Sequence, residues 1–408
     1  MYKMMACTGC ACLCDDVEVK QTGDKSFEVL NACAKGKKLI DSTNNQAARA
    51  KYLVRGKETD KETALESALQ LIKNSERFLI FGLDNSTTEA QATGIGLAQK
   101  RGAIIDDCSS YCHGPLIEQI LRDKIHSASL SVAKECDLII YWGSNPFHSH
   151  PRHLSLFSYY SHEDFSVTGW IPEATLCAVE TRETELTGMC DRVFKLPPGG
   201  DNEFLKAVLM RGQGTDESKA FVKLVEASNK TIIFAGLGLT HALCGDYEQY
   251  GKMIESFDRP GEIYTLPMVD HYNMRGFNHQ LYGKTGYVNR VSFGGNAVES
   301  GRRFSFLAQL NNETVDCALI IGSDPVSNLP RSLVKKLFKI PVILMDPMTT
   351  STTSAAHVAI PVAVSGVESG GGAVRMGGES VKLTQISNGH EYITDLDVLR
   401  FFLEGVSR

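Results

Sequence analysis

The stretch that decides how this chain folds around its chemistry is Ala6-Cys7-Thr8-Gly9-Cys10-Ala11-Cys12-Leu13-Cys14, complemented by Asn31-Ala32-Cys33-Ala34-Lys35-Gly36. Cys7, Cys10 and Cys14 have the spacing C-x2-C-x3-C. One loop can therefore present three thiolates while Cys33 supplies a fourth, and thiolates are the ligands that iron-sulfur clusters select. We predict that these four cysteines hold a [4Fe-4S] cluster.

A structural zinc site and disulfide bonds are the alternatives for these cysteines. Zinc sites usually combine two C-x2-C pairs or a histidine pair, and neither occurs near this loop. Disulfides need an oxidising compartment, whereas the start of the chain has no apolar signal core, so we expect a reducing cytoplasm. Cys12 is either a spare thiol or an alternative third ligand in place of Cys14, and the spacing favours Cys14.

Composition limits the classes of protein and of partner. With 408 residues, of which 43% are hydrophobic and 22% charged, the chain is expected to form two or three compact lobes. The formal net charge of -6 gives no electrostatic footprint for nucleic acid or for a membrane surface. No apolar run approaches the length of a membrane span, so we expect any electron donor to be another chain.

Short apolar runs that close on glycine or on a turn recur along the chain and predict buried strands. They lie at residues 77–82, 137–143, 174–179, 231–236, 317–322 and 341–346. Helical patterns accompany them at 62–73, 203–210, 216–227, 246–257 and 396–403, with another helix expected from Leu116. Alternating strand and helix predict the α/β class, with parallel sheets covered on both faces and ligands bound beyond the carboxyl ends of the strands.

Two of these strand ends resemble each other. Gly143-Ser144-Asn145-Pro146 follows one strand and Gly322-Ser323-Asp324-Pro325 follows another. Such a turn offers backbone amides and a short polar side chain to a ligand, although a single copy would be explained equally well as good turn chemistry. Two copies about half a chain apart indicate two related lobes that face one ligand.

A second pair of strand ends carries acidic and hydroxyl residues. Glu180-Thr181 follows the strand at 174–179, and Asp346 ends the strand at 341–346. An acidic residue in this position resembles the ribose contacts of dinucleotide-binding sheets, although a solvated turn is the simpler explanation. Neither lobe contains G-x-G-x-x-G, so the sequence gives no support for a nicotinamide or flavin dinucleotide.

Cys112-His113, followed by a Gly-Pro turn, places a thiol beside an imidazole. A buried thiol next to a capping histidine is the alternative to a functional pair. A cysteine protease fits less well, because adjacent side chains point in different directions and no third partner is identifiable. The context favours a metal ligand.

Together these motifs resemble one family. The cysteine spacing, Cys-x-Lys-Gly at 33–36, Cys112-His113, the two Gly-Ser-Asx-Pro turns, Leu266-Pro267-Met268 and the late Gly370-Gly371-Gly372 are similar to the molybdopterin and tungstopterin oxidoreductases of the formate dehydrogenase type. Within them the chain most resembles the B subunits of formylmethanofuran dehydrogenase. The resemblance covers nearly the whole chain.

The resemblance implies the cofactors and the site. Cys7, Cys10, Cys14 and Cys33 would hold the [4Fe-4S] cluster, Lys35 would lie between cluster and pterin, and Cys112 would be the protein ligand to tungsten or molybdenum in a bis(molybdopterin guanine dinucleotide) centre. His113 would exchange a proton. Residues implied to bind the cofactor at strand ends are Gly143, Ser144, Asn145, Glu180, Thr181, Gly322, Ser323, Asp324 and Asp346. Formate dehydrogenases use an active-site arginine, and the candidates here are His271 and Arg275, between which the sequence leaves the choice open.

The resemblance also implies partners and a division of the chain. We expect an iron-sulfur domain at 1–55, α/β lobes at 56–170 and 171–300, and a pterin-binding α/β segment at 301–408. Larger relatives append a barrel-like domain that closes over the dinucleotides; we expect this chain to lack it and a small D subunit to complete the site. An amidohydrolase-like A subunit, a C subunit and ferredoxin-like subunits would assemble with it, in a complex that could extend to heterodisulfide reductase.

Three other functions remain open at this point. One is a formate dehydrogenase or nitrate reductase subunit with another substrate, against which chain length argues. Another is a structural subunit that keeps the fold without metal or pterin, against which the cysteine quartet and Cys112-His113 argue. The third is a zinc-stabilised α/β binding protein.

Overall fold

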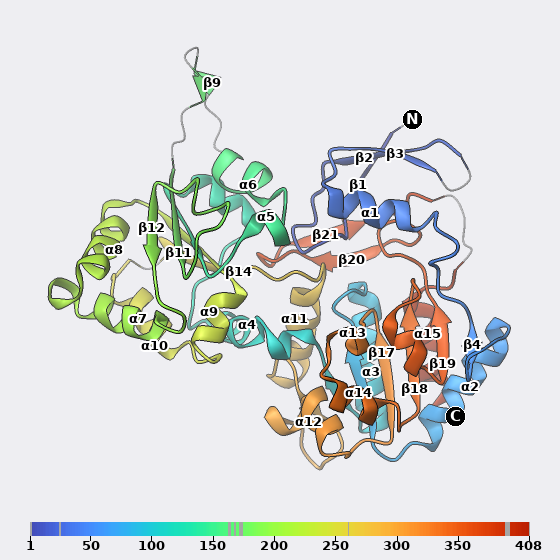
Figure 1. Ribbon diagram of the computed structural model, residues 1–408. Coiled ribbons are helices and arrows are strands. Elements are labelled where there is room, and N and C mark those ends of the chain that lie inside the picture. The colour runs from blue at the N-terminus through green and yellow to red at the C-terminus, as the bar shows by residue number, and fades with distance from the viewer. Residues whose placement is uncertain are drawn as a thin grey trace.

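The computed structural model describes residues 2–23, 26–161, 165–166, 169–170, 174–259, 261–387 and 392–407. These residues form two lobes, each built on a sheet with a parallel core. A small antiparallel sheet at the N-terminus lies over one of them (Figure 1).

The first lobe, here the large-sheet lobe, is built on nine strands in the order β16-β15-β7-β6-β17-β18-β19-β4-β5. Its strands are β4 (Leu53–Val54), β5 (Lys57–Glu58), β6 (Phe78–Gly82), β7 (Ile104–Asp106), β15 (Val291–Ser292), β16 (Glu299–Ser300), β17 (Cys317–Ile321), β18 (Val342–Asp346) and β19 (Val358–Pro361). The run from β7 to β19 is parallel. Because every residue of β6, β17, β18 and β19 is buried, these strands read as uninterrupted apolar runs in the sequence.

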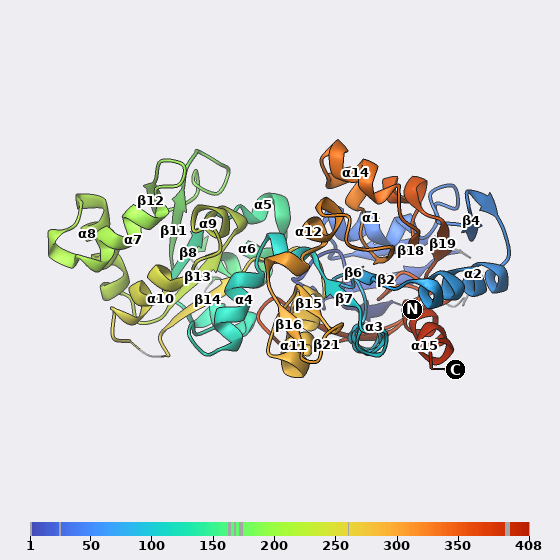
Figure 2. The ribbon, with the colours of Figure 1, turned by 90° about the horizontal axis from the view of Figure 1, so that it is seen from below.

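The second lobe, here the small-sheet lobe, is a five-stranded parallel sheet in the order β12-β11-β8-β13-β14. Its strands are β8 (Leu138–Trp142), β11 (Thr175–Glu180), β12 (Arg192–Lys195), β13 (Thr231–Ala235) and β14 (Ile263–Pro267). Figure 2, seen from below, shows the two lobes side by side with α4 (Gly114–Leu121) and α11 (Met274–Thr285) between them.

Helices cover both faces of the large sheet. On one face α2 (Lys61–Asn74), α3 (Thr88–Arg101) and α15 (Asp395–Gly405) pack into a core with β6 and β17. On the other face α12 (Phe306–Asn311) and α14 (Arg331–Leu337) cover the same strands. Capping side chains begin several of these helices; Thr87, for example, accepts from the backbone N–H of Ala90 at the start of α3.

The small sheet is covered differently on its two faces. One face packs against α7 (Asp201–Leu209), α8 (Asp216–Ala227) and α10 (Glu248–Glu255). The opposite face, through Tyr141 and Phe234, joins the core that contains the cysteine loop at 7–14. The N-terminal loop is therefore part of the packing that joins the lobes.

The N-terminal sheet consists of β1 (Lys3–Met5), β2 (Val17–Gln21) and β3 (Phe27–Leu30) in antiparallel order. The cysteine loop connects β1 to β2, and α1 (Ala34–Ser42) follows β3. The far end of the chain holds this loop, because Met376 donates its backbone N–H to Ala11 and Thr8 donates its hydroxyl to the Ser365 carbonyl. The hairpin of β20 (Gly371–Val374) and β21 (Ser380–Leu383) lies in this C-terminal segment.

The predicted α/β class with parallel sheets is confirmed, as are the buried strands and the helices expected from the periodicity. The expected ranges 56–170 and 301–408 do not coincide with lobes. Strands β6 and β7 share the large sheet with β17, β18 and β19, whereas β8 belongs to the small sheet. Each lobe is therefore assembled from segments that are distant in sequence.

None of the helices among the described residues has the length and apolar character needed to cross a bilayer.

Candidate functional site

The cysteine loop gathers the four cysteines predicted to hold the cluster. Cys7, Cys10 and Cys14 are buried, and Cys33 is partly buried at the N-cap of α1, where its sulfur accepts from the Gly36 N–H at 3.4 Å. Cys7 is close enough to Cys10 and Cys33 for their charges to act on its thiol. All four are free thiols in this structure.

Two glycines leave room around these sulfur atoms. A Cβ added at Gly36 would lie 2.7 Å from the Cys7 sulfur and 4.0 Å from the Cys33 sulfur, and one at Gly9 would lie 3.3 Å from the Gly36 backbone. Burial raises the pKa of Cys7 to about 11 and that of Cys14 to about 12. Buried thiolates need a compensating cation, and a thiolate-binding iron cluster would supply one, so this donor set fits the cluster.

Cys12 lies in the same loop but in a different environment. It is 1% exposed, and its sulfur lies within 4.8 Å of the Cys10 sulfur and of a His150 nitrogen. The hydrogen bond from Cys12 lowers the pKa of Cys10, while burial and that same bond raise the pKa of Cys12. Both ring nitrogens of His150 are engaged, with the Ser149 hydroxyl at 2.7 Å and the Val269 carbonyl at 2.8 Å. The arrangement favours Cys12 as a protonated neighbour of Cys10.

The two Gly-Ser-Asx-Pro turns line one cavity of about 1140 Å³ between the lobes. From the small sheet it is lined by Gly143, Ser144 and Asn145, and from the large sheet by Gly322, Ser323 and Asp324. Gly143 and Gly322 have positive φ of 58° and 56°, which favours glycine. A Cβ at Gly143 would also lie 2.4 Å from the Leu239 backbone nitrogen.

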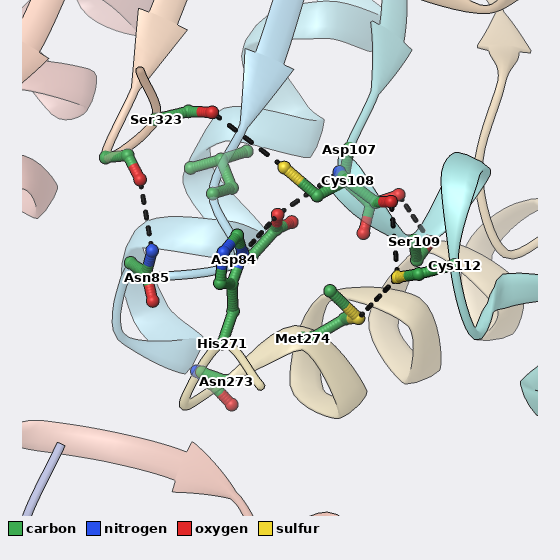
Figure 3. Close-up of polar contacts among 12 residues, drawn as sticks. Asp84, Asn85, Asp107, Cys108, Ser109, Cys112, His271, Asn273, Met274 and Ser323 are labelled. Atoms are coloured by element: carbon green, nitrogen blue, oxygen red, sulfur yellow. Dashed lines mark hydrogen bonds and ion pairs between the residues drawn. The ribbon is translucent and has the colours of Figure 1, made fainter. Parts of the chain in front are cut away.

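Cys112 and His113 lie in the wall of this cavity, just before α4. The Cys112 sulfur is 3.3 Å from the Cys108 carbonyl oxygen and 3.9 Å from the Met274 sulfur (Figure 3). Burial lowers the pKa of His113 to about 4, so the imidazole is neutral at pH 7, and its Nδ1 has no hydrogen-bond partner in the described part of the chain. A soft thiol facing a cavity between two sets of strand-end amides suits a sulfur-rich metal centre with a dinucleotide ligand.

The remaining residues predicted to bind cofactor line different cavities. Asp346 lines both this cavity and a neighbouring one of about 500 Å³, and burial raises the pKa of Asp346 to about 7. Lys35 lines the smaller cavity beside Thr8 and Gly9 and is ion-paired with Asp270. Glu180 and Thr181 line a separate pocket of about 540 Å³.

The two basic candidates differ in their surroundings. His271 lines both the 500 Å³ and the 1140 Å³ cavities. Arg275 is 2% exposed, lies near Gly378, and is among the residues lining neither of these cavities. Asp324 faces its own lobe as well as the cavity, since its carboxylate accepts from the backbone N–H groups of Ser351 and Thr352.

Sequence reasoning missed Asn85 and Cys108, which line the same cavity, and the buried Asp84, which accepts from the Cys108 backbone N–H (Figure 3). Asp84 is 2% exposed and follows β6, which ends on Gly82. The expectation that ligands bind beyond the carboxyl ends of strands, which we used for β8 and β17, would have indicated Asp84 and Asn85 if applied to β6. Cys108 had no signal beyond its spacing of four residues from Cys112.

Comparison with known proteins places the chain among one group of oxidoreductase components. It is 29% identical to the B subunit of the tungsten-containing formylmethanofuran dehydrogenase 2 of Methanocaldococcus jannaschii, over 100% of this chain and 98% of that one. It is 26% identical to the protein of the same name from Methanococcus maripaludis, over 100% and 99% of the two chains. A probable oxidoreductase of Bacillus subtilis is 31% identical over 34% of this chain and 15% of its own length. No protein-family model matches.

The fold is also found in a solved structure. With a TM-score of 0.70 and 19% identity, the chain is similar to one in the formyltransferase/hydrolase complex FhcABCD of Methylorubrum extorquens, determined with methylofuran. The similarity covers 87% of this chain and 98% of that one. The resemblance predicted from the motifs is thus confirmed, and the chain is a relative, along its whole length, of the B subunits of formylmethanofuran dehydrogenase, an oxidoreductase.

Proposed function

We propose that this chain is the catalytic subunit of a formylmethanofuran dehydrogenase and takes part in the reversible reduction of CO2 to formate. The observation that carries the proposal is the position of Cys112 and His113 in the wall of the cavity shared by the two strand-end turns. The names of the relatives that match along the whole chain support it.

In this proposal the cofactors are assigned to the residues that the resemblance implies. Cys112 would bind tungsten or molybdenum, the strand-end turns would bind two molybdopterin guanine dinucleotides, and Cys7, Cys10, Cys14 and Cys33 would hold the [4Fe-4S] cluster. When bound, these groups would deliver two electrons to the carbon of CO2. Lys35 lines the smaller cavity together with Thr8 and Gly9 of the cysteine loop, which supports a role for it in passing electrons from the cluster.

The protein's own part in the reaction is to hold charge and move one proton. Reduction of CO2 by two electrons and one proton gives formate. His113 is neutral at pH 7, and its unpartnered Nδ1 can accept the proton released in the reverse direction and return it in the forward one. A basic residue, His271 or Arg275, would offset the negative charge of the carboxylate.

Partners are expected for a chain of this kind. One solved relative of the fold belongs to a complex of four kinds of subunit, FhcABCD. We propose that this chain assembles in the cytoplasm with amidohydrolase-like A, C and small D subunits and with ferredoxin-like electron carriers, and that formate is condensed with methanofuran at a partner.

A structural role without metal is the second candidate. The solved complex of similar fold is described as a formyltransferase/hydrolase and not as a dehydrogenase. A chain could therefore keep this fold for assembly alone. The retained cysteine quartet and Cys112-His113 favour the catalytic role.

Metal analysis of the anaerobically purified complex tests the choice. We expect about one tungsten or molybdenum and about four cluster irons per copy of this chain. Cys112→Ala should lose the tungsten or molybdenum and formate turnover while keeping the cluster iron. Cys244→Ala, at an exposed cysteine, is the control and should change neither. Undiminished turnover with metal still bound to the Cys112→Ala complex would refute this ligand, and wild-type complex without tungsten or molybdenum would favour the structural role.

A further inference from the structure

Asp84 and His271 form a hydrogen-bonded pair at the wall between the two cavities. Asp84 follows β6 in the large-sheet lobe, and His271 lies in the segment that joins β14 to α11. The Nδ1 of His271 lies 3.0 Å from an Asp84 carboxylate oxygen (Figure 3). The side chain of Asp84 is 2% exposed, whereas that of His271 is 32% exposed.

Asp84 is fixed by two other segments of the chain, one at Cys108 and one at His271 to Asn273. The carboxylate oxygen that meets His271 also accepts the backbone N–H of Cys108 at 3.2 Å, and the Asp84 carbonyl accepts the backbone N–H of Asn273 at 3.0 Å. The acceptor for His271 is therefore rigid, and it fixes the orientation of the imidazole. Since Nδ1 faces Asp84, Nε2 is the nitrogen left for a ligand.

His271 lies where the two cavities meet, because it lines both. The carboxyl groups that share these walls have their charge offset in other ways. Asp270 is ion-paired with Lys35, Asp324 accepts two backbone N–H groups, and burial raises the pKa of Asp346 to about 7. Lys35 is engaged with Asp270, Lys38 lines only the smaller cavity and Arg182 only the larger one, so His271 is the basic side chain among the described residues that lines both.

The surroundings of the pair raise the pKa of His271 and lower that of Asp84. Burial lowers the pKa of His271, but the hydrogen bond and charge of Asp84, with a smaller contribution from Asp270, outweigh burial and raise it, while Lys35 acts in the opposite direction. Burial raises the pKa of Asp84, but the hydrogen bond and charge of His271, together with hydrogen bonds to Asp107 and Cys108, outweigh burial and lower it. Asp107 and Cys108 are the other titratable groups beside Asp84, and burial raises the pKa of each well above its ordinary value.

A metal site is the competing interpretation, since donor atoms of Asp84, Cys108 and His271 lie within 4.8 Å of one another. The geometry favours the hydrogen-bonded pair. The Asp84 oxygen nearest His271 already accepts from two N–H groups, and the Cys108 sulfur is 3.8 Å from the Ser323 hydroxyl, so a cation at that oxygen would have to displace existing bonds.

We propose that Asp84 and His271 form an anion-holding pair, in which Asp84 orients the imidazole and His271, when protonated, donates from Nε2 to an anionic oxygen, phosphate or carboxylate, of a ligand in these cavities. The inference rests on the proposed function, which supplies both oxygen sources: the pyrophosphate of a dinucleotide and formate. It also assigns the role left open between two residues to His271, since Arg275 lines neither cavity. Asp84 is then a positioning residue.

The experiment compares His271→Gln and Asp84→Asn in the assembled complex. Guanine nucleotide released by acid is counted per chain, and KM and kcat for formate oxidation are measured. If the oxygen is phosphate, nucleotide content should fall with kcat. If it is carboxylate, content should hold while the KM for formate rises about ten- to a hundred-fold, as expected for loss of one charge-assisted hydrogen bond. Asp84→Asn should change the nucleotide content or the KM for formate in the same direction as His271→Gln, but by less.

Two further variants separate a charge effect from a packing effect. His271→Lys keeps a positive charge and should restore part of the nucleotide content, or part of the KM for formate, that His271→Gln loses. If His271 had only a packing role, lysine would not restore either. His126→Gln removes an exposed imidazole that lines neither cavity, and should behave as wild type.

Three results would overturn the proposal. The first is a nucleotide content and a formate KM within about twofold of wild type in both His271→Gln and Asp84→Asn. The second is an impaired His271→Gln complex that His271→Lys does not improve. The third is zinc that is bound to the wild-type protein and lost in Asp84→Asn. If wild-type complex contains no guanine nucleotide, the proposed function fails separately. Calorimetry with inorganic pyrophosphate and with formate then tests the pair alone, and equal binding by wild type and His271→Gln would reject it.

Discussion

Individual cysteines in the N-terminal loop have different surroundings although they are neighbours in sequence. Cys12 is as buried as Cys10 and Cys14, so burial does not distinguish a ligand from a spare thiol. The distinguishing feature is the hydrogen bond, which lowers the pKa of Cys10 and raises that of Cys12. A thiol that donates to a cluster ligand stabilises the thiolate without itself binding iron.

The paired variants Cys12→Ala and Cys14→Ala test this assignment. We expect Cys12→Ala to keep about four irons per chain, with a small loss of stability from the lost thiol, and Cys14→Ala to lose the cluster. Iron analysis and electron paramagnetic resonance of the reduced protein measure both. Loss of the cluster in Cys12→Ala together with its survival in Cys14→Ala would make Cys12 the third ligand.

At the scale of elements, the strand-end turns are set by how closely two backbones approach. Gly143 and Gly322 have nearly the same positive φ, but their neighbours differ. A Cβ at Gly143 would meet the Leu239 backbone nitrogen at 2.4 Å, whereas one at Gly322 would meet the Asn85 Cβ at 3.3 Å. The turn after β8 is therefore less tolerant of a side chain than the turn after β17.

Alanine substitutions at Gly143 and Gly322 should lower the free energy of unfolding by different amounts. Gly322→Ala is expected to lower the free energy of unfolding by about 1 to 2 kcal/mol, the strain of a left-handed alanine, and Gly143→Ala by clearly more. Gly283→Ala is the control, because Gly283 is exposed within α11 with no atom within 4 Å of the added Cβ. It should leave stability unchanged or raise it by about 0.5 to 1 kcal/mol. Urea unfolding of the three variants measures the order, and equal losses at positions 143 and 322 would contradict it.

At the scale of the whole molecule, the two ends of the chain are held together near the cysteine loop. Arg49, which is 2% exposed on its side chain, is ion-paired at 3.0 Å with Glu368 and lies 3.9 Å from the centre of the Tyr392 ring. Arg375 donates to the Leu13 carbonyl and contacts Asp15. The C-terminal segment thus supports the loop that would carry the cluster.

Breaking the buried ion pair should therefore be costly. Arg49→Ala leaves the Glu368 carboxylate, 13% exposed, without its cation, and we expect a loss of about 3 to 5 kcal/mol in the free energy of unfolding together with weaker cluster retention. Lys51→Ala removes an ion pair with Glu58 whose side chains are 60% and 64% exposed, and should cost less than about 1 kcal/mol. Urea unfolding and iron content are the measurements. Similar stability of the two variants would show that the Arg49 pair does not hold the chain ends together.

The sequence by itself determined the α/β class and the strands buried on both faces, because periodicity is a local property of the chain. Ligand spacing, which is also local, indicated the cysteine quartet and the Cys112-His113 pair as candidate ligands. It also predicted that the two Gly-Ser-Asx-Pro turns would face one ligand, since the same turn recurs at the carboxyl end of a strand in each half of the chain and ligands of parallel sheets bind beyond those ends. The assembly of the lobes, with β6 and β7 in one sheet and β8 in the other, was decided only by tertiary packing. The same holds for the Asp84–His271 pair, whose members lie 187 residues apart and meet only because α11 packs against the large-sheet lobe.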